Sequence, residues 1–205
     1  RVRADHNHLV NHCLCMLLVV AGHRPTSALF ELTRFDFDTA NHCAIFRDKQ
    51  TDAAHLFRFV PTANIISEQI DAYLEHLRGL LEVDGLSEAT REVIRGALGG
   101  SGPLFLHVND DFLPVALRLR SWSESLPDQW QVLPLNWGRT WLSSRGRDVG
   151  IKPDDLAILL GHLESVGYPF SRLSPLEPAE LSRQLAAPLG RLARESGWLV
   201  RRGVQ

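Results

Sequence analysis

The order of helix-like and strand-like segments is the feature that most restricts how this chain can fold. Apolar residues recur with helical spacing over residues 5–22, whereas residues 43–48 and 55–60 are extended, phenylalanine-containing segments around a polar turn. From residue 65 to residue 196 helical spacing dominates again. Helices on either side of one antiparallel pair of strands indicate an α+β fold, a mainly helical domain with a small antiparallel sheet.

The helical segments differ in strength. The clearest covers residues 65–82, where isoleucines, leucines and Tyr73 form one inward stripe. Residues 104–106 are expected to form a short strand after a glycine-rich loop. A length of 205 residues suffices for one domain with a sizeable core, so residues 1–205 are expected to form a single domain. The remaining expected helices are 27–34, 87–98, 113–123, 136–144, 153–163 and 178–196.

Cysteine content and hydropathy indicate a protein of a reducing compartment. Cys13, Cys15 and Cys43 make no disulfide framework, and the first two are expected in the core. The apolar run 14–21 is too short to span a bilayer, and the residues before it do not form a signal peptide. We therefore expect a cytoplasmic location and no membrane contact.

The charge balance gives no bulk argument for nucleic-acid binding, because the formal net charge is −2. Only Lys49 and Lys152 are lysines, so twenty of the 22 basic residues (22 minus 2) are arginines. Arginine is the better residue for bidentate phosphate contacts, but GC-rich codon usage explains the excess equally well. A DNA-binding protein of this composition must gather its arginines on one face.

Four groups of residues follow one another in an informative order. They are Gly22, Arg24, Leu32 and Asp36, then Lys49 on the polar turn, then Asn136-Trp137-Gly138-Arg139, and last Leu160-Gly161-His162. This order resembles the catalytic domain of the tyrosine recombinase, or phage integrase, family. Arg139 and His162 are 23 residues apart (162 minus 139), close to the usual interval in that family. Each motif is weak alone, and their joint order over roughly residues 5–180 carries the resemblance.

The resemblance implies a site-specific recombinase that breaks and rejoins DNA through a covalent 3′-phosphotyrosine intermediate, with neither a metal nor another cofactor. Arg24 and Arg139 would stabilise the charge on the scissile phosphate, because guanidinium groups stay ionised and present paired N–H donors. Lys49 would protonate the 5′-oxygen leaving group. His162 would donate to the phosphate or take the nucleophile's proton.

The same resemblance implies double-stranded DNA as the partner, in the nucleoid of a bacterium. The last expected helix, 178–196, resembles the family's tail segment, which implies self-association on DNA. The family's N-terminal DNA-clamping domain is expected to be absent, since nothing precedes residue 5. Candidate contacts to backbone phosphates are Arg145, Arg147, Arg201 and Arg202.

Two positions depart from the family pattern. Asn136 stands where the family has a histidine, and an amide can donate to phosphate but cannot transfer a proton. The nucleophile is expected about nine residues after His162, at Ser171, whereas the candidate Tyr168 comes after six. The alternative is therefore a catalytically inactive, recombinase-derived DNA-binding or regulatory module. A helical protein-interaction domain with a chance match is a second alternative.

Each candidate also has an ordinary interpretation. Arg24 would be a surface arginine near a helix start, Lys49 a solvated turn residue, and His162 a favourable charge at a helix end. His8 and His12 are spaced for a metal, but a surface cluster is the better interpretation. Four tryptophans suggest either base stacking or core packing beside Arg139, and packing is the safer interpretation: Trp122, Trp130, Trp137 and Trp141.

Overall fold

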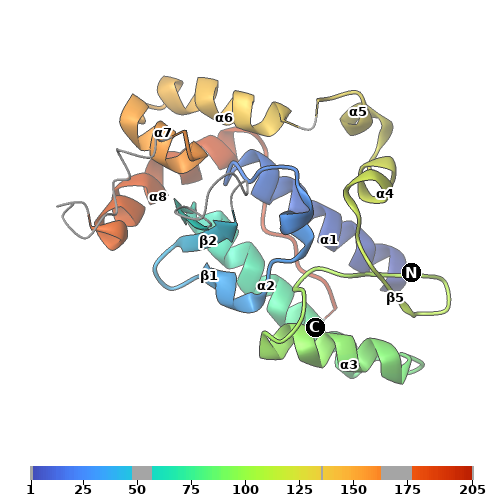
Figure 1. Ribbon diagram of the computed structural model, residues 1–205. Coiled ribbons are helices and arrows are strands. Elements are labelled where there is room, and N and C mark those ends of the chain that lie inside the picture. Colours follow the sequence, from blue (N-terminus) through green and yellow to red (C-terminus); the bar gives the residue numbers. More distant parts are fainter. Residues whose placement is uncertain (1, 48–56, 135, 163–176, 205) are drawn as a thin grey trace.

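The structure is a computed structural model that describes residues 2–47, 57–134, 136–162 and 177–204, and it confirms the α+β class. Helices dominate, and the sheets are small and antiparallel (Figure 1). The α-helices are α1 (Val2–Val19), α2 (Asn64–Leu81), α3 (Glu88–Gly99), α4 (Leu119–Glu124), α5 (Asp128–Gln131), α6 (Trp137–Asp148), α7 (Pro153–Leu160) and α8 (Pro178–Glu195).

Two antiparallel sheets accompany the helices. The larger has the strand order β1 (Phe37–Asp38), β2 (Cys43–Arg47) and β3 (Phe57–Pro61). In it Ile45 pairs with Phe59, so the two phenylalanine-containing segments form the expected antiparallel pair. The smaller sheet joins β4 (His107–Val108) to β5 (Pro114–Val115).

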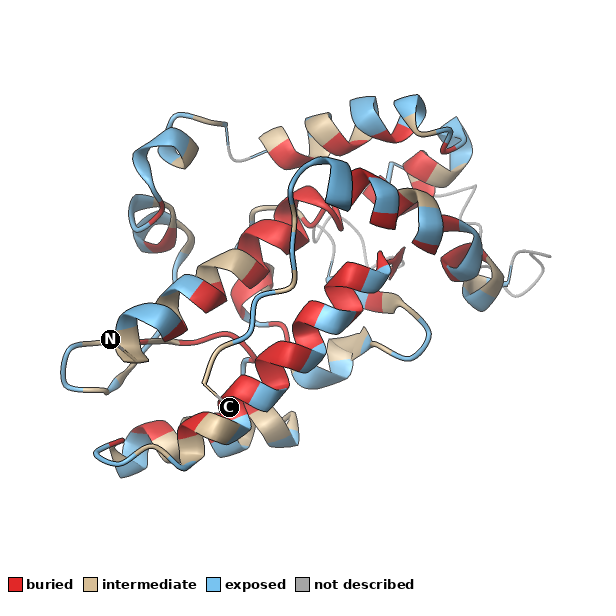
Figure 2. Cartoon of the chain, turned by 180° about the vertical axis from the view of Figure 1, so that it is seen from behind, coloured by how far each residue is buried: buried red, intermediate tan, exposed pale blue. Residues whose placement is uncertain are grey.

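Helix α1 is the centre of the molecule. It is buried almost all round from Leu9 onward, as expected for a helix whose apolar residues are not confined to one stripe (Figure 2). Helix α2 lies beside α1, and α3 lies against α2. Helix α6 lies over the C-terminal end of α1, and α7 packs against α6 and β3 (Figure 1). Burial raises the pKa of the Cys15 thiol to about 12, so this cysteine is an inert core residue. No helix within the described ranges is both long and apolar enough to cross a membrane.

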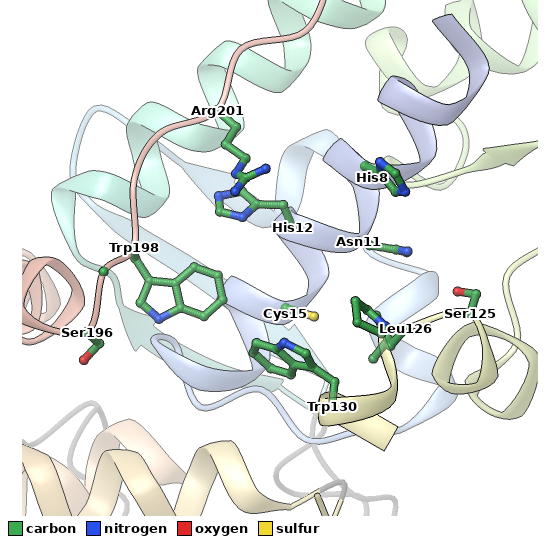
Figure 3. Close-up of a pocket in the computed structure, with 12 residues that line it drawn as sticks. His8, Asn11, His12, Cys15, Ser125, Leu126, Trp130, Ser196, Trp198 and Arg201 are labelled. Atoms are coloured by element: carbon green, nitrogen blue, oxygen red, sulfur yellow. The ribbon is translucent and has the colours of Figure 1, made fainter. Parts of the chain in front are cut away.

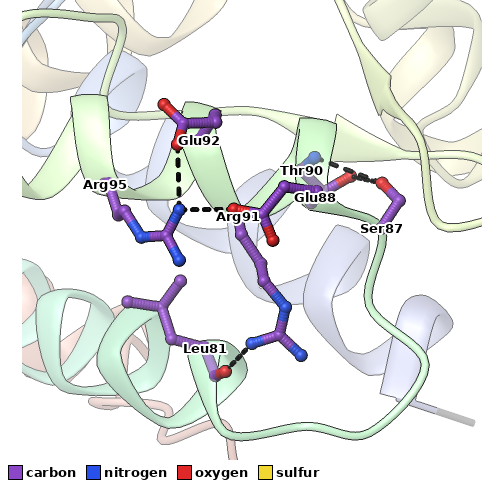
Figure 4. Close-up of polar contacts among 7 residues, drawn as sticks. All are labelled: Leu81, Ser87, Glu88, Thr90, Arg91, Glu92 and Arg95. Atoms are coloured by element: carbon purple, nitrogen blue, oxygen red, sulfur yellow. Dashed lines mark hydrogen bonds and ion pairs between the residues drawn. The ribbon is translucent and has the colours of Figure 1, made fainter.

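The start of α3 is fixed by local polar contacts (Figure 4). The Ser87 hydroxyl accepts a hydrogen bond from the Thr90 amide at 3.2 Å, a serine N-cap. The Arg91 guanidinium donates to the carbonyl of Leu81 and, at 2.9 Å, to that of Val83. Arg91 thereby satisfies carbonyls left without partners where α2 ends.

A chain of neutral histidines ties the C-terminal tail to the core. His6 Nε2 lies 2.9 Å from the Leu106 carbonyl, so this nitrogen carries the proton and Nδ1 accepts. His76 Nε2 therefore donates to His6 Nδ1 at 2.9 Å, and His76 Nδ1 accepts from the Val204 amide at 2.9 Å. These contacts, here named the histidine chain, connect α1, α2, the segment before β4 and the tail.

Most of the predicted helices are confirmed to within a few residues, including 65–82, 87–98 and 178–196. The prediction of a helix over 27–34 is wrong, because only a 3₁₀ turn, Ser27–Phe30, forms there. The Asp36 carboxylate accepts from the Thr33 amide at 2.6 Å, and this cap starts a second 3₁₀ turn at Arg34.

The stretch after residue 103 also differs from expectation. Residues 104–106 are buried but form no strand, and the strand follows at His107–Val108. The expected helix 113–123 begins only at Leu119, because Pro114 and Val115 pair with β4 as β5. The turn between the two strands is closed by the Phe112 amide, which donates to the Asn109 carbonyl at 3.1 Å. Helix α6 continues to Asp148, through part of the expected turn.

Candidate functional site

The turn after α1 brings Arg24 to the end of α7. Gly22 has a φ of 61°, and a Cβ there would lie 2.9 Å from a methyl carbon of Leu160, so both the backbone and the packing favour glycine. The buried His23 ring packs edge-on against Phe46 at 4.5 Å between ring centres. Arg24 follows, half-buried, and its Nη2 donates to the Gly161 carbonyl at 3.4 Å.

The first turn of α6 holds Arg139 against the same place. Gly138 lets α6 approach α1 closely, because a Cβ there would lie 2.6 Å from the Leu18 carbonyl oxygen. Arg139 Nη1 donates to the Gly22 carbonyl at 2.8 Å, and Nη2 donates to the Leu160 carbonyl. Both terminal nitrogens of the half-buried guanidinium thus donate to backbone carbonyls.

His162 lies just beyond α7, which ends at Leu160, whereas the sequence predicts it within the last turn of a helix over 153–163. Gly161 ends the helix in the left-handed region with a φ of 63°, and the His162 amide donates to the Ala157 carbonyl at 2.9 Å. This helix end leaves the His162 side chain exposed, with Nε2 at 3.1 Å from Arg139 Nη2. Arg24, Arg139 and His162 are therefore brought together from three separate segments.

A third arginine, Arg58, joins this place although no sequence motif marks it. Arg58 on β3 is only 5% exposed, and it donates to the carbonyl of Leu159 and, at 3.3 Å, to that of Gly22. Its guanidinium carbon lies 5.8 Å from the centre of the Phe46 ring, a cation–π contact. Strand alternation was the available signal, because Arg58 shares the inner face with Val60 while Phe57 points outward.

We name these four residues, Arg24, Arg58, Arg139 and His162, the arginine cluster. The three arginines donate to the Gly22 carbonyl and to the carbonyls at the end of α7, at Leu159, Leu160 and the C-cap Gly161. The C-terminal end of a helix carries partial negative charge, which favours guanidinium groups there. Since His162 is exposed and two of the arginines are half-buried, the arginine cluster extends from the core to the surface.

The other predicted site residues are not all placed. Lys49 and Tyr168 lie outside the described residues, as does Ser171, the position where the family spacing would place the nucleophile. Asn136 is exposed at the N-cap of α6, and its side chain makes no capping bond. The backbone carbonyl of Asn136 accepts a hydrogen bond from the Arg139 amide at 3.1 Å, in the first turn of α6.

None of the four predicted DNA-binding arginines touches the arginine cluster through a described side-chain contact. Arg145 pairs with Asp148 at 2.9 Å within α6, and Arg147 is exposed on the same helix. Arg202 lies 3.7 Å from Glu75, and Arg201 lies beside a cavity on the tail side of α1.

Helix α8, expected to resemble a tail that docks on a neighbour, packs its apolar face within its own chain. Leu181, Leu185, Leu189 and Leu192 are buried, and the helix lies against β3, α2 and α6. The histidines of α1 form no metal site with other described residues. Trp137 and Trp141 are half-buried against the core, with ring centres 6.1 Å apart, which agrees with a packing role beside Arg139.

No protein-family model matches the sequence, and a comparison with curated proteins finds no significant relative. The function is therefore argued from the geometry of the arginine cluster.

Proposed function

We propose that the arginine cluster is the phosphate-binding part of a DNA-breaking and -rejoining site of the tyrosine recombinase type. The observation that carries this proposal is the meeting of Arg24, Arg139 and His162, which belong to three separate motifs. Arg24 precedes Arg139 by more than a hundred residues (139 minus 24), and Arg139 precedes His162 by 23 residues (162 minus 139). The proposal extends to double-stranded DNA as substrate and to the bacterial nucleoid as the place of action.

The chemistry of the arginine cluster suits a phosphodiester. When a tyrosine oxygen attacks phosphorus, negative charge builds on the two non-bridging oxygens in the transition state. Guanidinium groups held in advance by backbone carbonyls stabilise that charge without having to reorganise. Arg24 and Arg139 are anchored in this way, and Arg58, buried behind them, adds a fixed positive charge.

The remaining steps are assigned to residues named from the sequence. Tyr168 is the proposed nucleophile, which forms a 3′-phosphotyrosine bond as the 5′-oxygen leaves. Lys49 protonates that oxygen, and His162 hydrogen-bonds the phosphate or accepts the tyrosine proton. Asn136 donates to the phosphate from the start of α6.

The test is a search for the covalent adduct. The full chain is incubated with a pool of nicked duplexes of randomised sequence, and protein-linked DNA is collected under denaturing conditions. We expect an adduct that disappears in Tyr168→Phe and falls about a hundredfold or more in Arg139→Lys, because a lysine cannot replace a bidentate donor. Arg95→Gln is the matched control, since Arg95 pairs with Glu88 and Glu92 on the exposed side of α3 (Figure 4).

Two outcomes would contradict the proposal in different ways. An adduct that persists in Tyr168→Phe would show that another residue is the nucleophile. If Arg95→Gln reduced the adduct as much as Arg139→Lys, the arginine cluster would have no special role.

A catalytically inactive DNA-binding or regulatory module is the second candidate. It is favoured by Asn136, which supplies no proton-transfer group, and by the carbonyl partners that already engage the arginines. Retained DNA binding with no adduct from any duplex in the pool would select this candidate. In that case Arg139→Lys would weaken DNA binding while Arg95→Gln would not.

A further inference from the structure

A second candidate site lies on the tail side of α1, away from the arginine cluster. It is a cavity of about 600 Å³ between α1, the segment around α5 and the chain that follows α8. Sites for small molecules usually have about 300–1,000 Å³, so this cavity has a suitable size. Its lining includes His8, Asn11, His12, Trp130, Trp198 and Arg201 (Figure 3).

The apolar part of the cavity is aromatic. The indoles of Trp130 and Trp198 lie with ring centres 6.2 Å apart and planes at 65°, and both are half-buried. The His12 ring lies 5.4 Å from Trp198. Three rings from α1, α5 and the tail thus face one space, an arrangement that favours a flat aromatic ligand.

The polar part of the cavity is basic. Arg201 points from the tail toward His12 (Figure 3), and no carboxylate stands among the lining residues that the structure describes. His12 Nε2 donates to the Leu199 carbonyl at 3.0 Å, which fixes the ring beside the guanidinium. The side-chain oxygen of Asn11, Oδ1, accepts from Trp122 Nε1 and His107 Nε2, both at 2.9 Å, so the side-chain amide is held in one orientation.

The tail that carries Arg201 is itself held firmly. Gln69 on α2 donates to the Arg201 carbonyl at 3.0 Å and accepts from the Arg201 amide at 2.7 Å. The histidine chain binds the same tail at Val204. The backbone of Arg201 is therefore held beside the cavity before any ligand arrives, which lowers the entropic cost of binding.

We propose that this cavity binds a mononucleotide, with the base against Trp130 and Trp198 and the phosphate on Arg201. Stacking on indole accepts any flat base, and a guanidinium beside a fixed imidazole binds a phosphate group. The site does not depend on the recombinase proposal, because its ligand is a free mononucleotide and its binding is measured without DNA.

The test is isothermal titration of the full chain with adenosine 5′-monophosphate. We expect a dissociation constant on the order of 0.1 mM, and at least about tenfold weaker binding of both adenosine and ribose 5-phosphate. Arg201→Gln should weaken the nucleotide about tenfold or more, and its exposed side chain makes the variant safe for folding. Arg202→Gln is the matched control, because it removes the same charge one residue away, beside Glu75 and outside the cavity.

Three results would overturn this proposal. The first is no binding of the nucleotide up to about 10 mM, weaker than the usual range for a specific site. The second is ribose 5-phosphate binding as tightly as the nucleotide, which would leave the aromatic rings without a role. The third is an equal loss in Arg201→Gln and Arg202→Gln, which would reduce the effect to general surface charge.

Discussion

Arginines bind the C-terminal end of a helix at two places in this molecule, and the two places differ. At the end of α2 a single residue, Arg91, donates to two carbonyls and comes from the next helix along the chain. At the end of α7 the arginine cluster brings three arginines and a histidine from four parts of the chain. The first arrangement is local and is sufficient to cap the helix. The second is assembled by the tertiary fold.

The number of arginines distinguishes a simple helix cap from the arginine cluster. One guanidinium has five N–H donors, enough to satisfy the carbonyls at a helix end. Three like charges near one helix end also repel one another, and that repulsion opposes folding. The phosphate proposed to bind here would offset that repulsion and would account for three arginines at one helix end.

The largest expected effect compares Arg58→Met with Arg91→Met. Arg58 is almost fully buried, so its loss removes the side-chain donor from the Leu159 carbonyl inside the core, while the Gly22 carbonyl keeps Arg139 as a donor. We expect the free energy of unfolding to fall by about 3 kcal/mol in Arg58→Met and by about 1 kcal/mol in Arg91→Met, whose carbonyls are nearer to solvent. Urea denaturation followed by circular dichroism measures both.

An equal loss of unfolding free energy in the two variants would show that Arg58 is an ordinary helix cap. The arginine cluster would then not differ from the Arg91 cap at its most buried residue. A gain of stability in Arg58→Met would show that charge repulsion in the arginine cluster outweighs its hydrogen bonds.

Acid should weaken the histidine chain and leave the arginines charged. Burial, together with the neighbouring His76, lowers the pKa of His6 from 6.5 to about 3. Below about pH 6.5 the unfolded chain therefore takes up a proton that the folded chain refuses, and the free energy of unfolding falls until about pH 3. His6 alone should cost about 2 kcal/mol between pH 6.5 and pH 5, whereas arginine does not titrate in this range.

Two variants on α1 isolate this effect in urea denaturation at several pH values. His6→Gln should flatten the fall of stability with pH, whatever its stability near pH 7. His8→Gln, an exposed neighbour on the same helix, should keep the slope of the unchanged chain. A full slope in His6→Gln would assign the acid effect to other groups, such as His107, whose pKa burial lowers to about 4.

The fold was predictable where local pattern and tertiary packing agree. The amphipathic stripe of 65–82 and the alternation of 55–60 gave α2 and β3 because each buries one face. The helix expected over 27–34 fails because a side-chain cap at Thr33 and a backbone bond from Leu104 to Leu32, at 2.7 Å, replace helical bonds. Such long-range contacts leave no periodic trace in the sequence.

The sequence predicted only those residues of the candidate site that belong to a recognisable motif. Arg24, Arg139 and His162 were named from their order, and the structure places them together. Arg58 carries no motif, and burial of an arginine depends on carbonyls from α7 and the Gly22 turn that only the fold supplies. The histidine chain was missed for the same reason, since His6 and His76 are 70 residues apart.

The smallest expected effect tests whether the arginine cluster binds an anion while the Arg91 cap does not. Inorganic phosphate at about ten times its dissociation constant should stabilise the chain by about 1.4 kcal/mol, which raises Tm by about 3–6 °C. Thermal unfolding at matched ionic strength should show this shift in Arg91→Gln and in Arg201→Gln but not in Arg24→Gln, whose half-buried guanidinium lies at the surface edge of the arginine cluster. Phosphate also stabilises proteins generally by exclusion from their surface, and that contribution is the same in all three variants. A shift that persists unchanged in Arg24→Gln would therefore reduce the arginine cluster to an elaborate helix cap, of the same kind as Arg91.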